Sequence, residues 1–225
     1  MKRIILVLTI LISGFSIAQK PIEKSIGEFN ELKVYDLIEV ELVKSNEDKV
    51  VITGNNNEDV LINNKNGTLK IKMNLEKIFD GNKTKVELHY RAVDVIDANE
   101  GSKVYGKDII KQFELDLRTQ EGGSIEVPVN VTYINIKAVS GGRIKTSGES
   151  KSQKISISTG GIYNGEELET EKTEVSINAA GEAHVKATTL VDVKIRAGGD
   201  VYIYGNPETV NESRVLGGRI KRMNE

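Results

Sequence analysis

Alternation of apolar and polar residues dominates the second half of the chain. From about residue 95 onward, runs such as YINIKAV and EVSIN place Val, Ile or Ala at every second position, with mainly Lys, Ser or Asn between them. One apolar face and one polar face with a period of two is typical of a β-strand. The pattern therefore predicts many short strands, each of which buries one of its faces.

A pair of small residues follows each run, and these pairs recur at a nearly constant interval. If the second residue of each pair is taken as an anchor, the anchors are Ser102, Gly123, Gly142, Gly161, Gly181, Gly199 and Gly218. Their successive spacings are 21, 19, 19, 20, 18 and 19 residues. A fixed period of about twenty residues indicates coils that stack on one another, since each strand is too short to form a sheet alone.

The apolar residues keep fixed positions relative to the anchors. Six residues before the anchor stand Ile96, Leu117, Ile136, Ile155, Val175 and Val193, and two residues after it stand Val104, Ile125, Ile144, Tyr163, Ala183, Val201 and Ile220. Parallel stacking at about 4.8 Å turns such positions into continuous internal ladders. The small pair then lies at a corner, where positive φ or close backbone approach excludes larger side chains. We therefore predict an all-β fold, a parallel β-helix or β-solenoid of about 19–20 residues per coil, with regular coils over about residues 96–220.

The N-terminal third does not continue this register. Residues 29–43, 50–53, 69–73 and 86–90 have the composition of strands, and Asn66-Gly67 and Asp80-Gly81 predict turns between them. Because the ends of a solenoid must be covered, we expect an irregular cap over about residues 19–95. A separate small β-domain is the alternative.

The first eighteen residues have the pattern of a signal peptide. Lys2 and Arg3 precede the apolar run IILVLTILI, and small residues at Ser16 and Ala18 suit a signal peptidase. The run is too short to cross a bilayer core of about 30 Å as a helix, and a buried N-terminal strand is the alternative. We predict a signal peptide at 1–18 and a β-helical domain at 19–225. The mature chain is expected to be exported, without membrane insertion, to the periplasm, the cell surface or the medium.

Composition and charge argue against several classes of chemistry. The 225 residues hold 31 Lys and Arg against 33 Asp and Glu, so nothing suggests a nucleic-acid partner. The chain has no cysteine, which excludes thiol nucleophiles and thiolate metal sites. The two histidines, His89 and His184, lie in no metal-binding or triad-like pattern. We expect no catalytic residues, no metal site and no cofactor.

Four charged residues at outward positions are candidates for a catalytic site. A glycosidase or lyase on a β-helix needs acids, or acids with bases, gathered on one outward stripe. Glu114, Asp116, Arg118 and Lys137 meet that description. Charges that alternate with buried apolar residues are also expected on any solvated strand, and we favour that interpretation.

Three further patterns are weak. The segment GSKVYGK at 101–107 matches the start of a phosphate-binding loop, but Asp108 stands where Ser or Thr is needed. Gly198-Gly199-Asp200 resembles one turn of a calcium-binding roll, but the other coils do not repeat the acid. Tyr105 and Tyr202 both lie three residues after an anchor, and the residues between them at that position form no aromatic stripe.

The chain resembles a known family. The residues that carry the likeness are FNELKVYDLIEVEL, VVITG, NGTLKIK and the later coils with GS or GG corners, over about residues 29–205. They resemble the "putative auto-transporter adhesin, head GIN domain" family of exported proteins of Bacteroidetes. The resemblance implies a single-stranded right-handed β-helix similar in shape to pectin lyases, without their catalytic residues, and a role in cell adhesion.

We therefore predict an exported adhesion or surface-binding module without catalytic activity. One alternative is a carbohydrate-active enzyme on a pectin-lyase-like β-helix, and another is an envelope scaffold with no dedicated ligand. The expected partner is a protein or glycan on another surface. The sequence identifies neither the binding residues nor the oligomeric state, and a homo-oligomer is one alternative.

Overall fold

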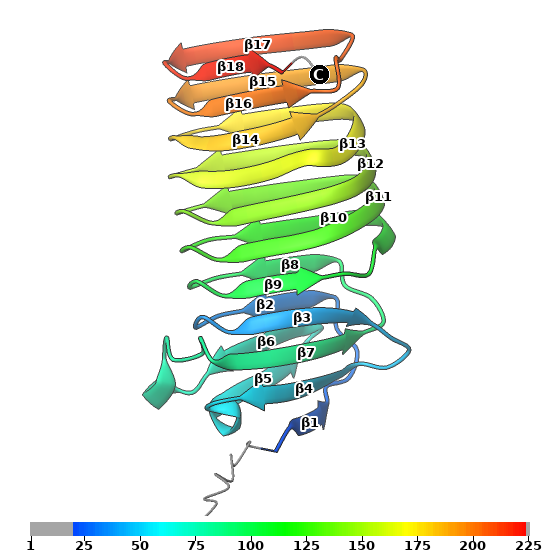
Figure 1. The fold of residues 1–225 in the computed structure, drawn as a ribbon, viewed down its shortest axis with the longest axis vertical. Coiled ribbons are helices and arrows are strands. Elements are labelled where there is room, and N and C mark those ends of the chain that lie inside the picture. Colours follow the sequence, from blue (N-terminus) through cyan, green and yellow to red (C-terminus); the bar gives the residue numbers. More distant parts are fainter. Residues whose placement is uncertain (1–19, 224–225) are drawn as a thin grey trace, which may run out of the picture.

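The alternating pattern folds into strands that stack as a β-solenoid in the computed structural model, which describes residues 20–223 (Figure 1). The signal peptide predicted at 1–18 lies outside the described residues. The regular coils are built by β8 (Val95–Ala98), β9 (Lys103–Gly106), β10 (Ile110–Thr119), β11 (Ser124–Val139), β12 (Arg143–Ser158), β13 (Gly161–Ile177), β14 (Gly181–Lys186), β15 (Leu190–Ala197), β16 (Asp200–Tyr204), β17 (Thr209–Leu216) and β18 (Arg219–Arg222). All pairs between these strands are parallel. The predicted fold class is confirmed.

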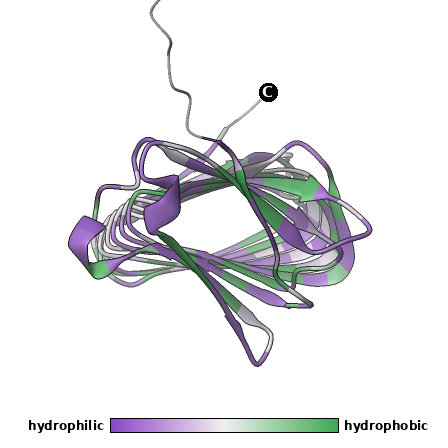
Figure 2. Cartoon of the chain, turned by 90° about the horizontal axis from the view of Figure 1, so that it is seen from below, coloured by the Kyte–Doolittle hydropathy of each residue, from purple (hydrophilic) through white to green (hydrophobic). Residues whose placement is uncertain are grey.

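The predicted ladders form the core. Leu117 pairs with Ile136 and Ile136 with Ile155, so the register between these strands is the sequence interval of 19. These residues and the other members of the two ladders from residue 96 to 201 are buried. Seen along the solenoid axis, the coils superimpose into a flattened tube (Figure 2). The tube therefore has two long outer sides, which carry the alternate, polar residues of each strand.

The two glycines of the pair Gly160-Gly161 are restricted for different reasons. Gly160 has a φ of 75° and follows Thr159 at 52°, so the corner turns through two consecutive left-handed residues. Gly161 lies outside the left-handed region, but a Cβ added there would lie 2.1 Å from the carbonyl oxygen of Ala138 in the preceding coil. Positive φ thus selects the first glycine, and close backbone approach selects the second.

Local insertions explain why the spacing is not always 19. In β13 the register with β12 shifts between Lys145, which pairs with Asn164, and Ser147, which pairs with Glu167. This bulge adds one residue to the coil and gives the interval of 20 between Gly161 and Gly181. The longest coil, between Ser102 and Gly123, contains the exposed side chains of Ile109 and Phe113.

A polar network lies inside the tube at β12 and β13. The fully buried Tyr163 hydroxyl lies 2.8 Å from Thr146 Oγ1 and donates to Gln153 Oε1 at 2.8 Å. Gln153 Nε2 donates in turn to Thr173 Oγ1 at 2.9 Å. Burial raises the pKa of Tyr163, so the hydroxyl stays protonated and remains a donor.

Replacing Tyr163 by phenylalanine should lower the free energy of unfolding by about 1–3 kcal/mol, because it leaves Gln153 Oε1 buried without a donor. Urea unfolding followed by circular dichroism measures this. Tyr133→Phe is the matched control, since Tyr133 is 43% exposed, and it should change stability by less than about 0.5 kcal/mol. Equal losses in the two variants would contradict the structural role of the network.

The N-terminal strands stack in an order that differs from their order in the chain. They are β1 (Ile22–Ser25), β2 (Glu31–Val34), β3 (Glu39–Lys44), β4 (Lys49–Gly54), β5 (Val60–Lys65), β6 (Thr68–Met73) and β7 (Thr84–Tyr90), with single helical turns η1 (Asn57–Asp59) and η2 (Leu75–Lys77). Leu32 of β2 pairs with Leu69 of β6 on one side and with Ile96 of β8 on the other. The coil of β2 and β3 therefore lies between β6/β7 and β8/β9, as Figure 1 shows.

Antiparallel strands complete the N-terminal end. β5 pairs with β6 as a hairpin across the predicted turn at Asn66-Gly67, while β4 pairs with β7 and β1 pairs with β4. Through these pairings the N-terminal strands share one sheet and one hydrophobic core with the regular coils. Neither described helix is long or apolar enough to cross a membrane.

The C-terminal coil has charges at positions where earlier coils have core residues. Glu212 pairs in register with the buried Val193, and Arg214 with the buried Ile195. Arg222 of β18 pairs with the buried Ile203. The last coil thus ends the apolar ladders with charged side chains, which suit an end that faces water.

Candidate functional site

The structure gathers the four charged candidates on one long side of the solenoid. Glu114, Asp116 and Arg118 alternate along the outward face of β10, and Lys137 lies beside Arg118 on β11. The same register places Asn135 beside Asp116 and Tyr133 beside Glu114. A shallow groove of about 280 Å³ crosses this region. We call it the upper groove, and its polar lining is Asp116, Arg118, Asn135, Lys137, Lys154 and Ser156.

The acids in this region are held by neighbouring side chains. Asn135 Nδ2 donates to Glu114 Oε1 at 2.9 Å and to Asp116 Oδ1 at 2.7 Å. Arg118 Nη2 donates to Asp116 Oδ2 at 2.6 Å. A general acid in a glycosidase needs a carboxyl group in an apolar environment, and neither of these carboxylates has one. The arrangement is better suited to holding a polar ligand than to transferring a proton.

An exposed aromatic pair lies at the edge of the upper groove and was missed from the sequence. The rings of Phe113 and Tyr133 meet edge to face, with centroids 5.2 Å apart and planes at 73°. Their exposed fractions are 66% and 43%, which is high for residues of this size. The available signal was that Phe113 breaks the alternation of its strand, in the longest coil.

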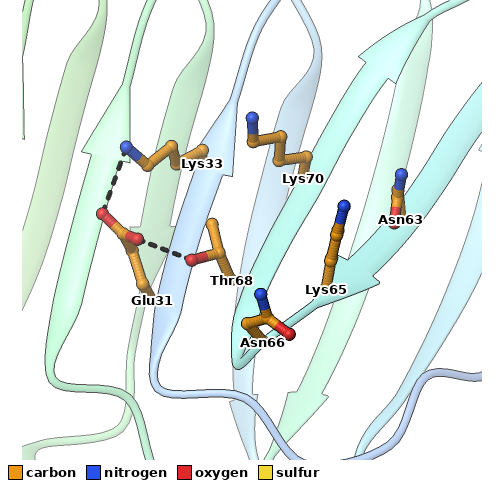
Figure 3. A pocket seen from close by; sticks show the side chains of 7 residues that line it. All are labelled: Glu31, Lys33, Asn63, Lys65, Asn66, Thr68 and Lys70. Carbon is orange, nitrogen blue, oxygen red and sulfur yellow. Dashed lines mark hydrogen bonds and ion pairs between the residues drawn. The ribbon is translucent and has the colours of Figure 1, made fainter.

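A second groove lies further down the same side, across β5, β6 and β2 (Figure 3). We call it the lower groove, and it encloses about 300 Å³. Its lining residues are Glu31, Lys33, Asn63, Lys65, Asn66, Thr68 and Lys70. Glu31 lies 3.2 Å from Lys33 Nζ and accepts from Thr68 Oγ1 at 2.8 Å. Partial burial acts to raise the pKa of Glu31, but the contacts with Thr68 and Lys33 together lower it below its usual value, so this carboxyl group stays ionised.

A row of charged residues connects the two grooves. Lys33 lies 3.8 Å from Asp97 of β8, which pairs in register with Arg118. Burial raises the pKa of Asp97, and Lys33 opposes this effect. The two grooves and this row form one continuous surface over β5, β6, β2, β8, β10, β11 and β12, which we call the grooved side.

The other long side carries the remaining sequence candidates. His184 of β14 stacks on Tyr202 of β16, with ring centroids 4.6 Å apart, and His184 Nε2 lies 2.8 Å from Glu182. Lys221 Nζ lies 5.7 Å from the centre of the Tyr202 ring, so a lysine of the protein itself packs over this ring. Tyr105 lies several coils away, and burial and nearby carboxylates raise its pKa to about 12.

Asp108 and Asp200 of the weak sequence motifs, and also His89, form contacts within the fold. Asp108, which follows the segment 101–107, accepts a hydrogen bond from the backbone of Lys44 at 3.1 Å. Asp200 forms an ion pair with Arg219 in the next coil, with Nε to Oδ1 at 2.8 Å. His89 lies 2.6 Å from Glu87. Among residues 20–223, no three His, Cys, Asp or Glu side chains are placed to hold a metal ion.

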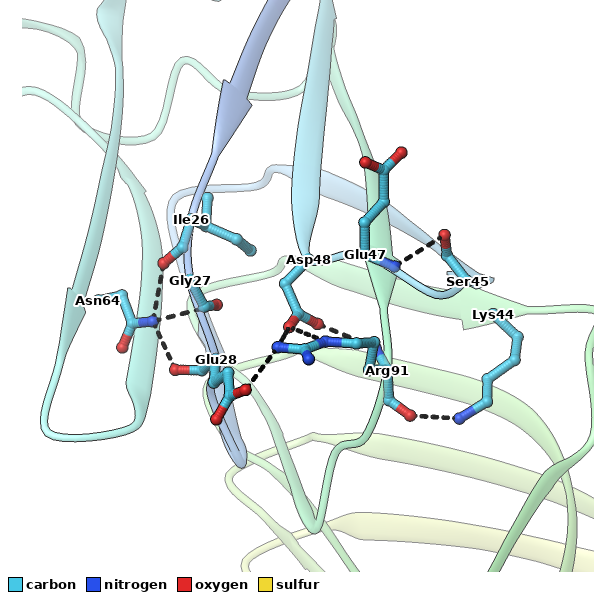
Figure 4. Close-up of polar contacts among 9 residues, drawn as sticks. All are labelled: Ile26, Gly27, Glu28, Lys44, Ser45, Glu47, Asp48, Asn64 and Arg91. Carbon is cyan, nitrogen blue, oxygen red and sulfur yellow. Dashed lines mark hydrogen bonds and ion pairs between the residues drawn. The ribbon is translucent and has the colours of Figure 1, made fainter.

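A polar cluster at the N-terminal end is structural (Figure 4). Arg91 donates from its backbone N to Asp48 Oδ1 at 2.9 Å and from Nε to Asp48 Oδ2 at 2.7 Å. Its Nη2 reaches Glu28 at 2.9 Å, and Asn64 Nδ2 donates to the carbonyl oxygens of Ile26 and Glu28. These bonds fasten the segment between β1 and β2 to β4, β5 and the end of β7.

Comparison with known proteins identifies similar sequences and folds. A family model described as "Putative auto-transporter adhesin, head GIN domain" matches residues 28–207. A solved structure of a "putative adhesin" from Bacteroides fragilis has a TM-score of 0.82 at 19% identity, covering 92% of this chain and 98% of that one. None of the curated proteins matches this chain.

Two structures from Parabacteroides distasonis have the same fold. A "putative adhesin" has a TM-score of 0.74 at 20% identity, covering 91% of this chain and 96% of that one. A "putative lipid binding protein" has a TM-score of 0.68 at 18% identity, with the same coverage of each chain.

Proposed function

Because the chain belongs to the family described as "Putative auto-transporter adhesin, head GIN domain", we propose that it is an exported, non-catalytic adhesion module. In this proposal an outward side of the solenoid binds a protein or glycan on another surface. The name given to a similar structure from Bacteroides fragilis, a "putative adhesin", supports the proposal.

The observation that carries the proposal is the extent of the grooved side. It runs without interruption across seven strands and has two shallow grooves, each of about 300 Å³ or less. A long surface of this kind accumulates many weak contacts, and several copies multiply their effect through effective concentration. It suits a polymer or another surface better than a small, enclosed molecule.

Beads coated with residues 19–225 should attach to envelope fragments of the source bacterium or to its neighbours, and cells lacking the protein should attach less well. Substituting outward residues of three adjacent coils together should weaken bead attachment strongly, while each single substitution should have little effect because the contacts are many and weak. Beads coated with the heat-unfolded protein are the control. Normal attachment by the deletion strain would favour an envelope scaffold instead.

The runner-up function is a carbohydrate-active enzyme that uses Glu114 and Asp116, the two acids held together by Asn135. Release of reducing ends from pectin or other polyuronates tests it. Our proposal expects none. Cleavage that disappears in Asp116→Asn would replace adhesion with catalysis as the function of this side.

A further inference from the structure

Four lysines of the grooved side differ from its acids and from Lys33 in having no partner of opposite charge. Within the part of the chain that the structure describes, Lys65 and Lys70 in the lower groove form no ion pair. The same holds for Lys137 and Lys154 in the upper groove. On the other long side, Lys145 lies 3.4 Å from Glu126, while among the described residues Lys103 and Arg143 form no ion pair and so provide a matched comparison.

The acids of the grooved side are already neutralised or hydrogen-bonded. Lys33 contacts Glu31 and Asp97, Arg118 contacts Asp116, and Asn135 contacts Glu114. An anion that approaches the surface therefore meets four unpaired ammonium groups in two clusters. This positive surface occurs on a chain whose net charge is −2, so it is local to this side.

The two lysine clusters are aligned along the solenoid axis. From β6 to β11 the neighbouring strands are β2, β8 and β10, so the clusters are four strand spacings apart. At about 4.8 Å per spacing this is about 19 Å. A small anion cannot contact both clusters, whereas an extended polymer that carries repeated negative charges can.

The upper groove adds groups that recognise sugars. The exposed rings of Phe113 and Tyr133 lie beside Glu114 and Asn135, so an apolar face and hydrogen-bonding groups are adjacent. A pyranose presents the same combination of an apolar face and hydroxyl groups. The lower groove is lined by polar and charged side chains alone, which does not suit insertion into a lipid bilayer.

We propose that the grooved side binds an acidic polysaccharide, a chain of sugars with carboxylate or sulfate groups that lies lengthwise across both grooves. This assignment rests on the proposed adhesion function and names its ligand class. The four unpaired lysines bind the acidic groups, and the aromatic pair packs against a sugar ring at the upper end.

Binding to polygalacturonate and dextran sulfate, measured by calorimetry against neutral dextran, tests the assignment. Both acidic polymers should bind, neutral dextran should not, and binding should weaken as salt is raised. Oligogalacturonates of increasing length should gain affinity steeply at the length that first spans about 19 Å. A constant affinity per sugar at all lengths would show that the two grooves do not act on one chain.

Charge-reversal variants locate the site. Lys65→Glu with Lys70→Glu, and Lys137→Glu with Lys154→Glu, should each weaken binding about tenfold. Lys103→Glu with Arg143→Glu changes the net charge equally on the other long side and should leave affinity unchanged. Equal losses of affinity in all three variants would show that overall charge alone determines binding, and would overturn the assignment.

The aromatic pair distinguishes a sugar chain from any polyanion. Phe113→Ala with Tyr133→Ala should weaken binding to polygalacturonate but not to inorganic polyphosphate. Binding to vesicles of anionic phospholipid, without binding to either polysaccharide, would assign the side to membranes and contradict the proposal. If coated beads attach to envelopes while no acidic polysaccharide binds, the adhesion function stands and only this ligand is wrong.

Discussion

Replacing Gly161 by alanine should lower the free energy of unfolding by about 3 kcal/mol or more, an effect as large as that of a severe core substitution. The added methyl carbon would lie 2.1 Å from the carbonyl oxygen of Ala138 and 2.5 Å from its carbonyl carbon. Both atoms are backbone in the adjacent coil, so they cannot move aside without breaking the stacking. The two coils would have to separate locally, and the ladder hydrogen bonds at the corner would lengthen.

The neighbouring glycine provides the matched control. Gly160 has no atom within 4 Å of an added Cβ, and its φ of 75° is the only obstacle. Gly160→Ala should therefore cost about 1 kcal/mol, the strain of one left-handed residue. Ala180 already occupies the equivalent corner position with a φ of 46°. Denaturant unfolding of both variants measures the difference, and equal costs would show that close approach does not select the second glycine.

Removing the charges from the C-terminal coil should make the protein self-associate more strongly. The changes are Glu212→Val, Arg214→Ile and Arg222→Ile, which continue the ladders of Val193, Ile195 and Ile203 to the end of the tube. An exposed strand edge with an apolar face is a template for pairing with another chain. Sedimentation velocity at increasing protein concentration should detect the association.

The control removes the same kinds of charge from the middle of the sheet. Glu126→Val, Lys103→Ile and Arg143→Ile lie on strands whose two edges are already paired, so no edge is created there. This variant should sediment as the unsubstituted protein does. Association by the control alone would mean that outward charge, and not the charged end, keeps the molecules apart.

The regular coils could be predicted from the sequence because position and environment repeat together. Residues 19 apart, such as Leu117 and Ile136, occupy the same place in neighbouring coils, so one pattern fixes both the strand and its partner. The N-terminal third could not be predicted in this way. Ile38 stands in register with the anchor Ser102, 64 residues later, and no small pair marks its corner. Gly81, from a different layer, supplies the close approach there.

Part of the candidate site could also be predicted from the sequence. The interval of 19 places Asn135 beside Asp116, and the structure has that pair. The lower groove could not be predicted from the sequence, because it combines strands that are adjacent only through the altered order of layers. The stack of His184 on Tyr202 was missed because the aromatic residues were sought as a stripe through every coil, and two neighbouring coils suffice for a contact.

The order of the N-terminal layers has a consequence for how the molecule assembles. Residues 31–44 are made first, yet both edges of that coil pair with strands made later, between residues 68 and 106. A chain that emerges N-terminus first must therefore keep this segment unpaired until its two neighbours arrive, and must close long loops to do so. Later coils add singly onto an existing edge. Folding should thus begin with one slow, concerted closure and continue by rapid stepwise growth, and unfolding should start at the C-terminal end.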